Sequence, residues 1–100
     1  MAQVEIIAES ETAGGWDFTA QILHKDGRLT QHRVRLAWAD YNLWSRDGSD
    51  APAAVAEAVL AFLMSKTSGD ERDELPAKFD ASLVRRRFAD ADETIPHLIG

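Results

Sequence analysis

Residues 52–64 read PAAVAEAVLAFLM and carry a single charge, Glu57. At about 100° per residue, the large apolar side chains of this stretch cover roughly 200° of a helix surface. They are Val55, Val59, Leu60, Phe62, Leu63 and Met64. An arc that wide belongs to a helix covered on more than one side. We therefore expect residues 52–64 to form the central helix of a small domain, with its large side chains against a sheet.

Three alanines lie along another side of this helix, namely Ala54, Ala58 and Ala61. We expect this strip to meet a second helix or a partner subunit. Ser49 or Asp50 can cap the helix, and a proline is tolerated in the first turn.

Three strands are expected before the helix. Residues 3–9 alternate imperfectly, with Val4, Ile6 and Ala8 on one face, and residues 10–15 are expected to form a polar turn. Residues 16–23 and 29–37 alternate clearly and predict the second and third strands.

The faces of these two strands decide how they pair. A two-residue turn at Asp26 and Gly27 would place Phe18 opposite Arg35 and mix apolar with charged side chains on one face. A three-residue loop instead gathers the apolar side chains. It pairs Trp16 with Leu36, Phe18 with Val34, Ala20 with His32 and Ile22 with Thr30. Gly27 would then take the left-handed position of a bulged turn, and we prefer this register.

The chain after the central helix begins with a polar stretch. Residues 65–78 are expected to form a solvated loop, and a second, shorter helix is predicted from 81 to about 88 with Asp80 as its cap. Residues 90–94 break the helical pattern, and 95–99 form a short apolar end. The whole, residues 1–100, is predicted to be one α+β domain: a three-stranded antiparallel meander packed on a central helix, then a short helix.

Composition limits the chemistry and the partners that we expect for this protein. The 100 residues include no cysteine, which excludes disulfides and thiolate metal sites, and the net charge is −6. A protein this acidic makes nucleic acid an unlikely partner, because neutralisation of phosphates supplies most of that affinity. The sequence shows neither a signal-peptide pattern nor an apolar run of about 18 residues, so we expect a cytoplasmic location and no membrane association.

The sequence offers no chemistry that requires an enzyme. The histidines, His24, His32 and His97, lack the spacing of a metal site, and the serines lie outside any nucleophile elbow. Glycine-rich phosphate loops are missing as well. We therefore expect a protein without catalytic residues, metal or cofactor.

Two groups of residues are candidates for binding. Trp38, Tyr41 and Trp44 recur every three positions in a predicted helical turn or packed loop. They either close one end of the core or form an exposed aromatic patch for a partner, since tryptophan and tyrosine are enriched at interface hot spots. Arg33 and Arg35 share one sheet face, which is either a solvated surface or a recognition site for an anionic ligand or RNA.

The basic run of residues 85–87 has a simpler explanation. Its charges fall in the last turns of the second predicted helix, where they complement the helix dipole.

Three motifs carry a resemblance to a known family. They are GWDF at 15–18, P-x-x-x-x-E-A-V-L-A-F-L-M at 52–64 and F-D-x-S-L-V-x-R-R-F at 79–88. In this order the chain resembles a family of uncharacterised bacterial and archaeal proteins of about 90–100 residues that has no assigned activity. The strand-then-helix order is also distantly similar to HicB-type antitoxins, as an architecture without their DNA-binding module.

These observations predict a non-catalytic protein-interaction or regulatory module. Its partner would be another protein or a second copy in a homodimer, bound through the aromatic segment and the helical face. The alternative is a small-ligand or nucleic-acid binder that uses the face of Arg33 and Arg35.

Overall fold

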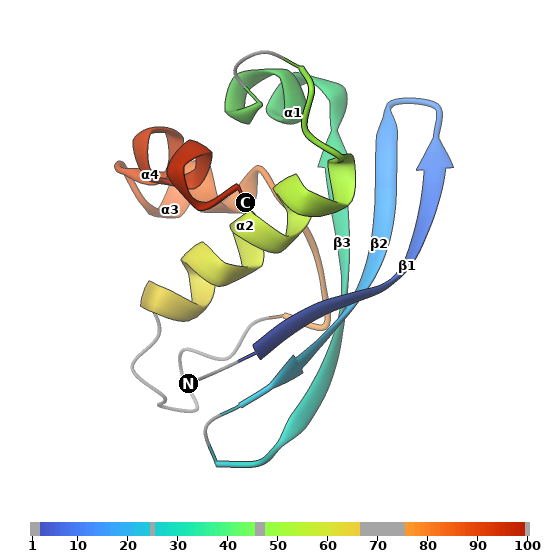
Figure 1. Cartoon of the computed structure of the whole chain (residues 1–100), viewed down its shortest axis with the longest axis vertical. Helices are drawn as coiled ribbons and strands as arrows, with labels where there is room; N and C mark the ends of the chain where they lie inside the picture. Colours follow the sequence, from blue (N-terminus) through green and yellow to red (C-terminus); the bar gives the residue numbers. More distant parts are fainter. Residues whose placement is uncertain (1–2, 25, 46–47, 67–75, 100) are drawn as a thin grey trace.

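The computed structural model consists of a sheet with helices on one of its faces. It describes residues 3–24, 26–45, 48–66 and 76–99. Figure 1 shows the strands forming one layer and the helices gathered on one face of it. The strands are β1 (Gln3–Thr12), β2 (Gly15–Leu23), β3 (Leu29–Ala37) and β4 (Lys78–Asp80), in that spatial order. The first three form the expected antiparallel meander, whereas β4 adds in parallel to β3 and makes the sheet mixed.

The pairing of β2 with β3 confirms the register predicted from the apolar faces. Phe18 lies opposite Val34, and Ala20 lies opposite His32. Gly27 has a φ of 89°, the left-handed conformation that the turn requires. Burial on the helix side therefore outweighs the preference of an Asp-Gly pair for a two-residue turn.

The predicted face of Ala8 is wrong because β1 contains an irregularity. The register shifts between Ile6 and Ala8, so that Ala8 pairs with Thr19 on the outer face of the sheet. β1 also continues to Thr12 and pairs it with Gly15, so that much of the expected turn at 10–15 is strand. A bulge of one residue reverses the face of every residue that follows it.

β4 corrects the end of the loop predicted for residues 65–78 and the prediction that Asp80 is a helix cap, because Lys78 and Asp80 belong to a strand. Residues 67–75 of that predicted loop lie outside the described residues. Phe79 lies opposite Val34 and is 9% exposed. The Arg33 N–H donates to the Ala77 carbonyl at 2.8 Å, and the Ala81 N–H donates to the Arg35 carbonyl at 2.7 Å. Three residues are too few to show a period of two, so this parallel strand has no sequence signal.

α2 (Pro52–Lys66) is the central helix, as predicted. It buries seven side chains: Val55, Ala56, Ala58, Val59, Leu60, Phe62 and Leu63. Figure 1 shows α2 crossing the sheet and lying between the strands and the C-terminal helices. In the alanine strip, Ala58 is buried, Ala54 is half-buried and Ala61 is exposed.

Three shorter helices complete the layer. They are α1 (Trp38–Trp44), α3 (Leu83–Arg87) and α4 (Ala91–Leu98). α3 is shorter than the helix predicted for 81–88. The expectation that residues 90–94 break the pattern is wrong, because α4 begins at Ala91 and buries Ala91 and Ile95. Its two acidic residues in the first turn suit the helix dipole, and packing against α2 holds it despite Pro96.

Candidate functional site

The three aromatic residues of α1 have different environments. Trp44 is completely buried, and its Nε1–H donates to Asp92 Oδ1 at 3.0 Å. Tyr41 is 5% exposed, and its hydroxyl donates to backbone carbonyls of the following loop. Trp38 is 46% exposed. Tyr41 and Trp44 therefore close one end of the core, and Trp38 alone of the three presents a broad surface to solvent.

Trp38 is held in place by neighbouring rings. Its ring centroid lies 4.5 Å from that of Trp16 and 5.9 Å from that of Tyr41. Its backbone N–H donates to the Gly14 carbonyl at 3.0 Å, at the turn between β1 and β2. An exposed indole fixed in this way offers a contact surface at little cost in side-chain entropy.

The end of β1 brings acidic side chains to the same face. After the bulge, Glu9 lies opposite Phe18 and Glu11 lies opposite Trp16. Phe18 and Trp16 are core residues on the helix side of the sheet, so both glutamates point to that side, and both are exposed. Glu11 is thus the cross-strand neighbour of the ring on which Trp38 packs.

β1 also has an open edge. It pairs with β2 on one side, and within the described residues no strand pairs with its other side. In Figure 1 the second half of β1 is the outermost part of the sheet, away from α3 and α4, whereas its beginning runs toward α2. We call the open edge of β1 with Glu9 and Glu11, together with Trp38, which follows β3 and packs on Trp16 of β2, the β1 edge surface.

A shallow, open groove of about 590 Å³ adjoins the beginning of β1. Its lining comprises Gln3, Val4, Glu5, Gln21, Leu23 and Leu29. Leu23 and Leu29 are 40% and 60% exposed, although both are large and apolar. The β1 edge is therefore bordered by apolar side chains near its beginning.

The two predicted arginines lie on the outer face of the sheet, where the structure adds a third cation. Arg33 and Arg35 are both exposed, and the parallel strand β4 places Lys78 beside Arg33. Arg35 lies between Asp17 and Asp80 in register. Sequence reasoning missed Lys78, because its position follows from the parallel pairing of β4.

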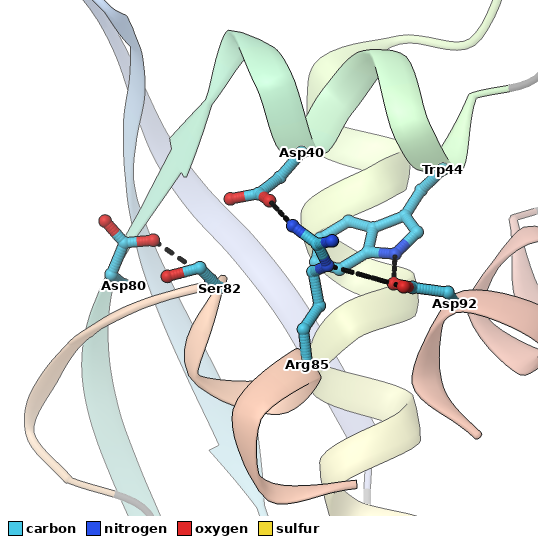
Figure 2. A network of polar contacts seen from close by, with 6 residues as sticks. All are labelled: Asp40, Trp44, Asp80, Ser82, Arg85 and Asp92. Carbon is cyan, nitrogen blue, oxygen red and sulfur yellow. Dashed lines mark hydrogen bonds and ion pairs between the residues drawn. The ribbon is translucent and has the colours of Figure 1, made fainter. Parts of the chain in front are cut away.

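A polar network joins α1, α3 and α4 (Figure 2). Arg85 donates from Nη1 to Asp40 Oδ1 at 3.2 Å and from Nε to Asp92 Oδ1 at 3.2 Å. Asp92 also accepts the indole N–H of Trp44. Burial raises the pKa of Asp40, and the hydrogen bond and charge of Arg85 oppose that rise. The network connects three helices to one another, which is a structural role for the first arginine of the basic run.

A second series of hydrogen bonds includes two histidines. His32 Nδ1 lies 2.8 Å from the Pro76 carbonyl, and its Nε2 lies 2.8 Å from Thr30 Oγ1. A carbonyl can only accept, so His32 donates from Nδ1, and its Nε2 shares a hydrogen bond with the Thr30 hydroxyl. His24 Nε2 is 2.7 Å from the same hydroxyl oxygen and is hydrogen-bonded to it. These hydrogen bonds connect Pro76, which lies just before β4, to β3.

In the part of the chain that the structure describes, no group of three or more histidine, aspartate or glutamate side chains is arranged to hold a metal ion. None of the described helices combines the length and apolar character needed to cross a membrane. Comparison with family models, with curated proteins and with solved structures found no match to this chain. The resemblance to a small prokaryotic family therefore stays a prediction.

Proposed function

We propose that the protein is a non-catalytic module that binds another protein at the β1 edge surface. The observation that carries this proposal is the open edge of the ten-residue strand β1. The edge opposite β2 has no partner strand among the described residues. An extended segment can add to such an edge, with affinity supplied by main-chain hydrogen bonds and specificity by side chains. The fixed, half-exposed indole of Trp38 provides the kind of anchor that dominates binding energy at interfaces.

The test combines capture with mapping. Immobilised wild-type protein should retain a stoichiometric protein partner from a lysate of the source cell, and Trp38→Ala should retain less. Leu43→Ala is the matched control, because Leu43 is a similarly exposed apolar residue of the same helix, at 42%.

Hydrogen exchange of the captured complex then locates the interface. Amides of β1 should gain protection, because strand addition occupies their open side. Equal capture by wild type and Trp38→Ala, or protection confined to other elements, would contradict this function.

A second candidate function uses the outer face of the sheet. Arg33 and Lys78 are direct cross-strand neighbours of like charge, an arrangement that a bound anion would relieve. The candidate ligand is a small anion or a nucleic acid. It predicts binding of a single-stranded RNA oligonucleotide or inorganic phosphate that weakens with salt and with Arg33→Ala or Arg35→Ala. Binding that ignores salt, or its complete absence, would count against it.

A further inference from the structure

We propose that the partner segment is extended and basic, with arginine or lysine side chains beside Glu9 and Glu11. This inference rests on the proposed function and specifies the chemistry of the partner. It follows from the charges on β1, the face on which they lie and the apolar groove at the beginning of the strand.

The charges on β1 have one sign. The strand reads QVEIIAESET, so it carries three glutamates and no basic residue. All three, Glu5, Glu9 and Glu11, are exposed. The chain as a whole has a net charge of −6, which favours approach of a cationic partner. Complementary charge across an interface steers encounter and rejects wrong partners.

The bulge places two of these charged side chains on the helix side of the sheet. Without it, residues 9 and 11 would lie on the outer face with Glu5; with it, they lie on the helix side. A strand added to β1 would have its alternate side chains on that side, next to Glu9 and Glu11.

The beginning of β1 favours a different side chain. The groove beside it exposes Leu23 and Leu29, which can bury an apolar residue of the same segment. The edge surface therefore fits a strand in which basic residues alternate with apolar ones.

A second copy of this chain does not fit. Pairing β1 with β1 of another copy would bring two acidic strands together, and like charges directly opposite are destabilising. The occupant is therefore a different protein.

The experiment measures binding of three synthetic decapeptides by fluorescence anisotropy. One alternates arginine and valine, one alternates arginine and glycine, and one alternates glutamate and valine. The first combines charge with strand preference, while the other two each remove one of these properties. We expect the arginine–valine peptide to bind most tightly, and its affinity to fall as salt is added.

Variants then assign the contact. Glu9→Gln with Glu11→Gln should weaken binding of the arginine–valine peptide by roughly five- to tenfold. Glu93→Gln is the control, because Glu93 is an exposed acid on α4, away from β1 in Figure 1, and its removal should leave affinity unchanged.

The outcomes separate this inference from the proposed function. Equal binding of the arginine–glycine peptide, or equal loss in Glu93→Gln, would show general charge attraction and overturn the inference. A captured partner that protects β1 but contacts it with a neutral or acidic segment would also overturn it, while leaving the proposed function in place. Protection away from β1 would overturn both.

Discussion

At the scale of single residues, the two tryptophans of α1 illustrate how position in a helix separates stability from binding. Trp44 is completely buried and donates a hydrogen bond to Asp92, whereas Trp38 is 46% exposed on top of Trp16. Both are potential hot-spot residues by type. Their burial assigns one to the core and leaves the other free to contact a partner.

Alanine substitutions should therefore differ in effect. Trp44→Ala should lower the free energy of unfolding by about 3–5 kcal/mol, because it leaves a cavity and removes the hydrogen bond to Asp92. Trp38→Ala should cost about 1–2 kcal/mol, since much of this ring already faces water. Urea denaturation measures both values, and a larger loss for Trp38→Ala would contradict the arrangement.

Asp40 makes the folded state sensitive to pH. Burial raises the pKa of this carboxyl above its ordinary value of 3.8, against the opposing effect of Arg85. The folded chain therefore binds this proton more tightly than the unfolded chain. The resulting stability is fully present below the unfolded pKa and is lost as the pH rises through the folded pKa.

Asp40→Asn should remove this dependence, because the amide cannot ionise. The difference in free energy of unfolding, wild type minus Asp40→Asn, should fall as the pH rises from about 3.5 to about 7. Taking the difference cancels the contributions of other titrating groups to the pH dependence. One such group is Asp90, whose pKa is lowered by the hydrogen bond and charge of the Lys66 ammonium. Chemical denaturation at several pH values provides the measurement, and a difference that grows with pH would refute the assignment.

At the scale of elements, β4 depends on contacts made across the fold. The hydrogen bond from His32 Nδ1 to the Pro76 carbonyl fixes the chain immediately before β4. Parallel pairing then continues through the backbone hydrogen bonds of Arg33 and Ala81. A three-residue strand has little stability of its own, so its position relies on this anchor and on Phe79 in the core.

His32→Ala should loosen β4 selectively. The lost hydrogen bonds and packing should destabilise the fold by about 1–3 kcal/mol, and the amides of Arg33 and Ala81 should exchange faster than those in the β1–β2 ladder. His97→Ala is the control, because His97 is an exposed histidine of α4. Uniform acceleration across the whole sheet would mean that β4 is not a separate weak element.

At the scale of the whole molecule, charge governs how the open edge of the sheet behaves. Unpaired strand edges promote edge-to-edge association, and charged side chains are one of the ways in which natural proteins prevent it. We expect Glu9 and Glu11 to have this effect on β1, in addition to their proposed role toward a basic partner.

The purified protein should accordingly be monomeric by sedimentation at low salt. Glu9→Thr with Glu11→Thr should promote self-association, because the edge loses its repulsion and gains strand propensity. Glu57→Thr with Glu93→Thr removes the same number of charges from exposed helical positions and should stay monomeric. A stable wild-type dimer, or equal association of both double variants, would be incompatible with this role of the edge.

Several features of the fold follow from local sequence. The wide apolar arc of residues 52–64 predicted the central helix, and the matching of Phe18 with Val34 predicted the β2–β3 register. Both depend on periodic burial, which repeats over enough residues to be visible in one chain. The aromatic segment and the two arginines were also found as candidate surfaces, because unusual residue types are visible without a fold.

The sequence by itself therefore determined the class of fold, the central helix and the residue types available for binding. Tertiary structure alone decided that Tyr41 and Trp44 are buried while Trp38 is exposed, that Lys78 lies beside Arg33, and that the bulge turns Glu9 and Glu11 toward the helix side. The physical reason is the separation along the sequence of the residues whose contacts decide each feature. Periodic patterns report the average environment of a segment, whereas a one-residue bulge, a three-residue parallel strand and the exposure of one ring depend on partners distant in the sequence.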